Sequence, residues 1–151
     1  MDRVQDTFLL VGRLLIAALF LNAGIPKALQ GYGGGFAKGL GTMGVPYPEI
    51  VGVVAVAIEV LVPIALILGV FPRISALLLI AFVIVATGLA HRFWEFPEGR
   101  ELVRQWTAQQ SSFLKNIAII GGLLFYYVSG PGRFALAGRG AGAGVGAHAR
   151  A

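Results

Sequence analysis

The sequence predicts an all-α membrane protein, a four-transmembrane-helix bundle with an amphipathic surface segment between helices three and four. Two observations predict this fold class. The 151 residues are 57% hydrophobic and only 13% charged, whereas soluble domains carry about 25% charged residues. The apolar residues also gather in runs long enough to cross a bilayer. Because so small a chain cannot hide this much apolar surface in one soluble core, we expect lipid to cover most of it.

The first expected element is a transmembrane helix over residues 8–25. The MDRVQDT before it is too acidic for a signal peptide, and no A-x-A cleavage site follows, so this helix should be retained. Arg13 lies inside the helix. Its guanidinium can snorkel to the nearby headgroups, or it can form an ion pair with Glu59 within the bundle. Lys27 follows Pro26 and marks the far interface.

The glycine-rich segment 30–48 is expected to be a loop, with a short surface helix near residues 36–43. It contains GLGTMG, which matches the dinucleotide-binding pattern G-x-G-x-x-G. We reject that function because the motif neither follows a strand nor opens a helix of a βαβ unit. Tyr32 and Tyr47 suit an interfacial belt of aromatic residues.

Residues 50–70 predict the second transmembrane helix, which one acid, Glu59, and one proline, Pro63, interrupt. An ionisable group near the middle of such a helix costs about 2.5–3.5 kcal/mol on insertion scales, so it normally has a partner or a task. Three interpretations of Glu59 stay open: pairing with Arg13 or with a polar group of a neighbouring helix, handling of a ligand or proton, and a simple neutral acid. Pro63 removes the usual N–H partner of the Glu59 carbonyl.

A short FPR turn leads to the third helix, residues 74–89, so the second and third helices should be antiparallel neighbours. The next segment, HRFWEFPEGRELVRQWTAQQSSFLK, is amphipathic and carries aromatic anchors. We expect it to lie on the membrane surface as a cap over one end of the bundle. The fourth helix is a short apolar run at 117–128 that Phe113 and Leu114 extend. Four spans place both termini on one side.

The domain organisation follows from these elements. Residues 1–137 are expected to form a single four-helix membrane domain, and residues 138–151 a disordered tail rich in glycine and alanine. The positive charges do not orient the domain, because five lie on the side of the termini and six on the other side.

Composition excludes several kinds of site. The chain has no cysteine, which excludes disulfides, thiol catalysis and thiolate-ligated clusters within it. It has only two histidines, so we expect no metal site. The net charge of +5 is not gathered in a basic patch with interleaved aromatic residues, so we expect no nucleic acid partner. Contacts with lipid headgroups explain the charge better.

Polar residues gather at one mouth of the expected bundle. A small amphipathic ligand such as a quinone suits this mouth, because it needs a donor or proton carrier at its head and an apolar wall along its tail. The alternative is that His91 and Trp94 are ordinary interface anchors and that Asn116 makes an interhelical hydrogen bond. The candidate ligand-binding or intramembrane polar residues are Arg13, Asn22, Lys27, Glu59, His91, Trp94, Lys115 and Asn116.

An ordered set of motifs resembles the DoxX family of small four-helix bacterial membrane proteins. The motifs are GRLLIAALFLNAGIPKAL from residue 12, MGVPYPEIVGVVAVAIEVLVPIALILG from residue 43, AHRFW from residue 90, FLKNIAIIGGLL from residue 113 and GPGRFAL from residue 130. The resemblance implies four transmembrane helices in the inner membrane, with cytoplasmic termini. It also implies that six residues match recurring polar positions of the family: Arg13, Lys27, Glu59, His91, Lys115 and Asn116. Pro26 before Lys27 is less typical of the family.

The resemblance also carries an expectation of function. The family is named by similarity to a membrane subunit of thiosulfate:quinone oxidoreductase, and some members are associated with redox partners. We therefore expect a quinone-associated or redox-complex membrane subunit, whose partners are the bilayer, a quinone, redox proteins and further copies of the chain. The alternatives are a structural or partner-binding membrane protein without catalytic activity and, third, a small-solute transporter. The sequence assigns no catalytic residue.

Overall fold

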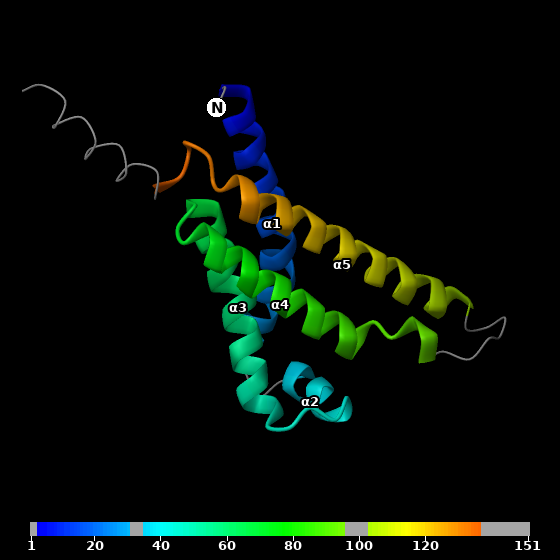
Figure 1. Ribbon diagram of the computed structural model, residues 1–151. Coiled ribbons are helices and arrows are strands. Elements are labelled where there is room, and N and C mark those ends of the chain that lie inside the picture. The colour runs from blue at the N-terminus through cyan, green and yellow to red at the C-terminus, as the bar shows by residue number, and fades with distance from the viewer. Residues whose placement is uncertain (1–2, 31–34, 96–102, 137–151) are drawn as a thin grey trace, which may run out of the picture.

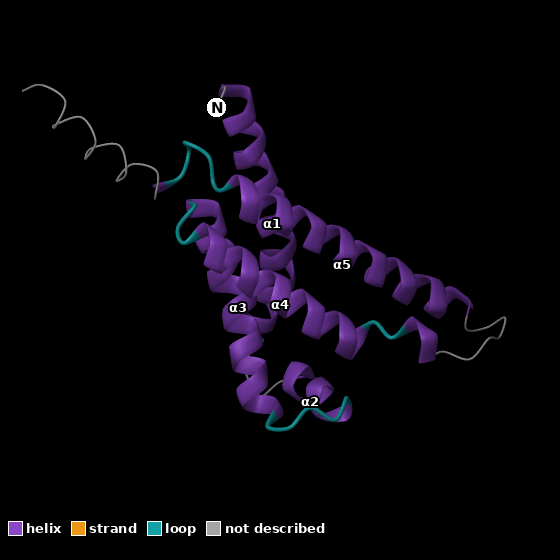
Figure 2. Ribbon diagram, in the orientation of Figure 1, coloured by secondary structure: helices purple, strands orange, loops and turns teal. Residues whose placement is uncertain are grey.

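The computed structural model describes residues 3–30, 35–95 and 103–136 (Figure 1). Within these ranges the chain forms helices and no strand (Figure 2). The elements, in chain order, are α1 Arg3–Leu29, α2 Gly35–Thr42, α3 Pro48–Leu68, α4 Pro72–Ala90, the 3-10 helix η1 Phe93–Glu95 and α5 Val103–Ser129.

Four of these helices are long and apolar enough to cross a membrane. They are α1, α3, α4 together with η1, and most of α5, whereas α2 is too short to span. The structure thus confirms the predicted class of an all-α, four-span membrane bundle. The short helix expected near residues 36–43 is also present, as α2.

The turn between α3 and α4 shows why the spans end where they do. Gly69 ends α3 in the left-handed conformation, with φ 68°, and the capping N–H groups bond to the carbonyls of Ala65 and Leu66. Pro72 then occupies the first turn of α4, where its missing N–H costs nothing. This tight turn makes α3 and α4 antiparallel neighbours, as the sequence predicts.

The spans are arranged as two antiparallel pairs. Helix α1 packs chiefly on α3, and α4 packs chiefly on α5, while contacts between α3 and α4 join the pairs. In Figure 1 the α4–α5 pair slants away from the α1–α3 pair, and α2 lies beneath the opening. The fully buried core at the junction is small and apolar, and it includes Ala17, Phe20, Leu66, Leu79 and Leu123.

Helix α5 begins earlier than the sequence predicts. From Val103 onward the amphipathic segment and the last span form one continuous helix, α5, which ends at Ser129. Phe93 and Trp94 of η1 pack edge-on against Phe113, with ring centroids 5.4 and 6.0 Å apart. Phe93 and Trp94, the aromatic cap, therefore pack against the first half of α5. Phe96, another aromatic residue of the amphipathic segment, lies outside the described residues.

Candidate functional site

A cavity of about 550 Å³ lies in the opening between the two helix pairs. Residues of all four spans and of α2 line it, and most of its wall is apolar. Five of the eight predicted polar candidates come together there: Lys27, Glu59, His91, Lys115 and Asn116. Asn22, Trp94 and Arg13 do not line this cavity.

The centre of the polar wall is an ion pair between Lys27 and Glu59. The Lys27 Nζ atom lies 2.6 Å from Glu59 Oε2 and 2.8 Å from Oε1. The Glu59 side chain is buried, at 7% exposure, and that of Lys27 is partly exposed, at 29%. The same ammonium lies 4.7 Å from the centre of the Phe36 ring, so a residue of α2 covers the pair.

This contact identifies a partner for Glu59. Its partner is a polar group of a neighbouring helix, which was one of the predicted alternatives. The predicted ion pair of Glu59 with Arg13 is wrong, because Lys27 in the last turn of α1 is the cation that contacts Glu59. Since Lys27 follows Gly24 by one turn of α1, and α1 approaches α3 closely at that glycine, its side chain reaches Glu59.

His91 ends α4 at the edge of the cavity and contacts a residue that the sequence analysis missed. Its Nδ1 atom lies 2.7 Å from Gln109 Oε1 on α5. With the amide oriented in this way, Nδ1 carries the hydrogen and Nε2 of a neutral ring stays available as an acceptor. The only sequence signal for Gln109 is its place on the polar face of the amphipathic segment.

Asn116 makes the interhelical hydrogen bond that the sequence predicts. Its Nδ2 donates to Thr87 Oγ1 at 2.8 Å, which joins α5 to α4. The Thr87 hydroxyl donates in turn to the Val83 carbonyl at 2.6 Å. Thr87 was missed, although it lies one turn before His91 in a mostly apolar helix. The neighbouring Lys115 is mostly exposed and lines the cavity mouth.

Two candidates do not contribute to this cavity. Trp94 is exposed and packs within the aromatic cap on Phe93 and Phe113. An interface anchor therefore stays the prediction for this residue. Asn22 is exposed on α1 and does not line the cavity.

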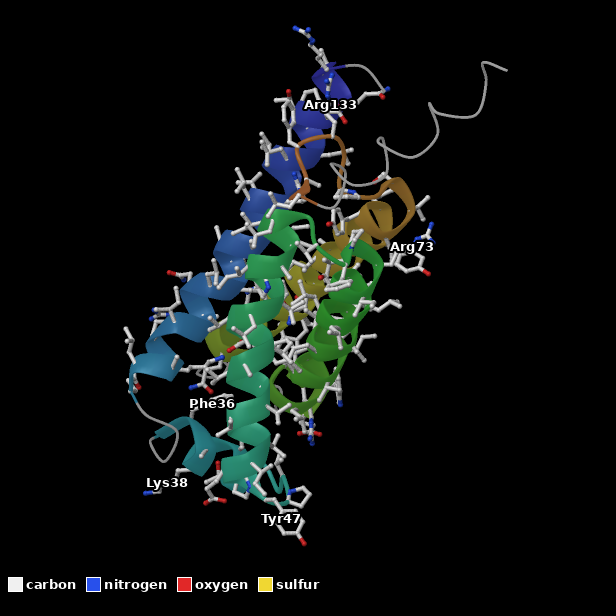
Figure 3. The ribbon with its side chains drawn as sticks, turned by 90° about the vertical axis from the view of Figure 1, so that its left-hand side faces the viewer. Phe36, Lys38, Tyr47, Arg73 and Arg133 are labelled. Atoms are coloured by element: carbon white, nitrogen blue, oxygen red, sulfur yellow. The ribbon has the colours of Figure 1, made fainter. Side chains whose placement is uncertain are left out.

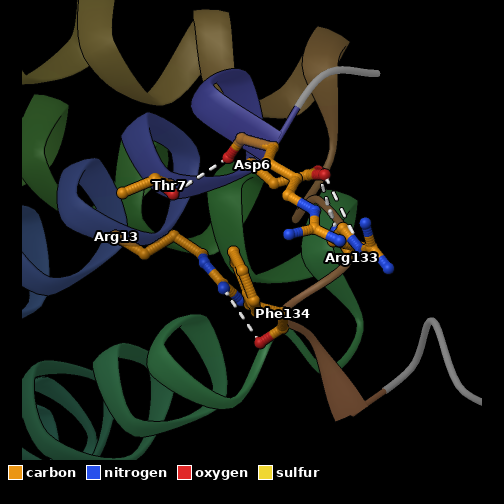
Figure 4. A network of polar contacts seen from close by, with 6 residues as sticks. Asp6, Thr7, Arg13, Arg133 and Phe134 are labelled. Carbon is orange, nitrogen blue, oxygen red and sulfur yellow. Dashed lines mark hydrogen bonds and ion pairs between the residues drawn. The ribbon is translucent and has the colours of Figure 1, made fainter.

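Arg13 belongs to the opposite end of the bundle, at the side of the N-terminus. It does not snorkel, because only 1% of its surface is exposed. Its Nη2 donates to the Phe134 carbonyl at 3.2 Å, and the Arg133 N–H donates to Asp6 Oδ1 at 3.0 Å (Figure 4). Residues 130–136 thus fold back over the end of α1. The predicted tail, residues 138–151, lies outside the described residues.

The two ends of the molecule therefore differ in chemistry. Figure 3 shows Arg73 and Arg133 at the end that holds the N-terminus, and Phe36, Lys38 and Tyr47 at the other. The large cavity lies toward the α2 end, and the charged or titratable residues that line it are Lys27, Lys115, His91 and one carboxylate, Glu59. Hydrogen-bond donors and an acid–base group thus face an apolar space that opens toward lipid.

Comparisons with known proteins agree with this fold. The DoxX family model matches residues 8–92, which is more than half of the chain. The chain is 28% identical over 135 residues to the inner membrane protein YphA of Escherichia coli (strain K12), covering 87% of this chain and 89% of that protein. It is 28% identical over 138 residues to the inner membrane protein YqjF of the same strain, covering 90% and 94%. No solved structure matches. With four spans and a match over this length, the chain belongs to the DoxX family.

Proposed function

We propose that this chain is a multi-pass protein of the inner membrane that binds a quinone and serves as the membrane subunit of a redox complex. The observation that carries the proposal is the cavity of about 550 Å³ with its buried ion pair and mostly apolar wall. The two relatives named as inner membrane proteins support the location.

The cavity fits the two halves of a quinone. Its volume lies within the usual range of ligand sites, which is about 300–1,000 Å³. Apolar side chains such as Val54, Ile58 and Phe82 line the wall, and the exposed Val54 and Val85 carry that wall out to the lipid-facing surface. An isoprenoid tail can therefore remain in lipid while the head meets the polar end.

The polar residues would hold the head by hydrogen bonds. Lys27 and Asn116 carry N–H donors, and quinone carbonyls are acceptors only. A bound quinone supplies two-electron redox chemistry, which requires proton exchange at its oxygens. His91 is suited to that exchange, because Gln109 fixes one ring nitrogen and leaves the other available.

The test is to quantify quinone in protein purified in mild detergent, by mass spectrometry of the extracted lipids. We expect about one quinone per chain in the wild type, and about tenfold lower occupancy in Glu59→Gln and His91→Ala. Lys38→Ala is the control, since Lys38 lies on the outer face of α2. The proposal is wrong if the wild type carries only bulk lipid, or if both cavity variants retain their quinone and their co-purifying proteins.

A second candidate function is a structural or partner-binding membrane protein without catalytic activity. The Lys27–Glu59 pair favours this function as well, since the pair joins α1 to α3 and a purely structural role is sufficient to explain it. This alternative predicts that Glu59→Ala lowers the thermal stability in detergent and changes neither bound quinone nor partner proteins.

A further inference from the structure

A second cavity, of about 320 Å³, lies at the end of the bundle that holds the N-terminus. Residues of α1 and α5, with Leu66 of α3, line it. Its wall is almost entirely apolar apart from Arg13, Tyr126 and Ser129. The strongly exposed Phe8 and Phe125 lie at its rim, on surfaces that face lipid. The cavity is therefore open to an amphipathic molecule from the bilayer.

Three buried polar atoms of residues that line this cavity lack hydrogen-bond partners. The buried Nε and Nη1 atoms of Arg13 have no hydrogen-bond acceptor, and neither does the hydroxyl of Tyr126. All of these groups can donate, and a guanidinium can only donate. A buried donor without an acceptor costs about 1–3 kcal/mol, and more when it is charged. The Tyr126 oxygen beside Arg13 can accept one of these bonds, but it is uncharged, so the arrangement lacks an anionic acceptor.

The charge of Arg13 is also unbalanced. Among the described residues, no carboxylate forms an ion pair with its guanidinium. The buried acid of this end, Asp6, instead accepts a hydrogen bond from the Arg133 backbone N–H and lies 4.0 Å from the Arg133 Nε atom in an ion pair. The Phe134 carbonyl supplies one neutral acceptor. A buried cation in a membrane bundle without a counter-charge is unfavourable, so an anion would stabilise it.

We propose that Arg13 and Tyr126 form a binding site for a phosphate group. Phosphate suits these donors because it carries charge and several acceptor oxygens, and it pairs with guanidinium by charge-assisted hydrogen bonds. Either an anionic lipid headgroup or free phosphate can supply the group. The apolar wall and the rim of Phe8 and Phe125 favour the headgroup, because the glycerol and upper acyl chains would cover them.

The site is independent of the quinone proposal, since it lies at the other end of the bundle and shares no lining residue with the large cavity. Its test is a thermal-shift titration of the full chain in mild detergent, with three probes: phosphatidylglycerol, inorganic phosphate and, as a lipid control, uncharged diacylglycerol. The variants are Arg13→Gln and Tyr126→Phe, and the matched control is Tyr127→Phe, which lies outside this cavity.

We expect phosphatidylglycerol to raise the melting temperature of the wild type and of Tyr127→Phe, with a weaker shift in Tyr126→Phe and none in Arg13→Gln. A shift with inorganic phosphate that depends on the same residues supports a free anion as the source. If Arg13→Gln does not fold, the titration midpoints of Tyr126→Phe and Tyr127→Phe decide, and we expect at least a threefold difference. Equal midpoints in these two variants, or no shift of the wild type with either phosphate probe, would overturn the proposal.

Discussion

The Lys27–Glu59 ion pair places two opposite charges where only one has access to water. Both carboxylate oxygens lie within 2.8 Å of the ammonium, but the Lys27 side chain retains 29% exposure. Solvent therefore screens part of the attraction, while Glu59 pays the larger desolvation cost. Removing one partner should cost more than the pair itself contributes, because the other charge stays in the bundle.

The first prediction concerns this pair. Lys27→Met should lower the free energy of unfolding by about 1–3 kcal/mol, because it leaves Glu59 without its donor. Adding Glu59→Gln should recover part of the loss, so the two changes should not be additive. Unfolding titrations in mixed micelles with sodium dodecyl sulfate give the four free energies of the cycle.

The control for the first prediction is Lys38→Met, which removes an exposed lysine from α2 and should leave stability within experimental error. Strict additivity of Lys27→Met and Glu59→Gln would contradict the coupling that the distances indicate.

A second prediction concerns Asn116. Asn116→Leu should reduce stability by about 0.6–2 kcal/mol, since it removes the hydrogen bond to Thr87 that joins α5 to α4. The same titration measures it. Thr87→Val should cost a similar amount, and the double variant should lose little more than either single change; a doubled loss would show that the two side chains act separately.

At the scale of residues, the sequence identifies which side chains matter better than it identifies their partners. Glu59 could be singled out because a charge in an apolar run stands alone. Its partner could not, because helical rise gives the depths of Arg13 and Lys27 but not the direction in which each helix face points. Gln109 and Thr87 were missed because a single polar residue on a helix is common and carries no spacing signal.

The third prediction concerns the contact of α1 with α3. A Cβ atom on Gly24 would lie 2.8 Å from the Glu59 Cβ and 3.0 Å from Val60 Cγ2. Gly24→Ala should therefore separate the two helices and cost about 1–3 kcal/mol. Gly12→Ala is the matched control on the same helix, since nothing lies within 4 Å of its added Cβ. Differential scanning fluorimetry should show a lower melting temperature only for Gly24→Ala; equal temperatures would mean that the contact is not close.

At the scale of elements, the spans could be predicted from their apolar length, but their ends could not. Helix α1 continues through Pro26 to Leu29, and α3 continues past the buried Pro63 to Leu68. Proline weakens a helix, yet packing against neighbours compensates in both. The start of α5 was placed too late because its polar first turns resemble a surface segment, whereas the helix runs unbroken from Val103 to Ser129.

The fourth prediction concerns the orientation of the whole molecule. The chain has no cysteine, so a single cysteine introduced at either end of the bundle reports the membrane orientation without labelling of native cysteines. Arg73 lies at the end that holds the N-terminus, and Lys38 at the other (Figure 3). If the termini are cytoplasmic, as the family resemblance implies, a membrane-impermeant maleimide should label Lys38→Cys and spare Arg73→Cys in right-side-out vesicles. The reverse pattern would invert the proposed topology, and both should react after detergent is added.

At the scale of the whole molecule, the number of spans follows from the sequence, and an even number places both ends on the same side of the membrane without saying which side that is. The slant between the two helix pairs does not, because it depends on side-chain packing at the junction of α3 and α4. The large cavity is a consequence of that slant, so its polar residues could be predicted but not the space that they face. The return of residues 130–136 over α1 has no signal beyond the glycines that permit the turn.

That return also sets an order of events during synthesis. Lys27 and Glu59 are 32 residues apart, whereas Arg13 and Phe134 are 121 residues apart. At translation rates of about 5–20 residues per second, roughly 6–24 s separate the synthesis of Arg13 from that of its carbonyl partner. The first helix must therefore enter the bilayer with an unsatisfied guanidinium, held for that interval by water, headgroups or the insertion machinery. The earliest helix of the chain is the last to complete its burial.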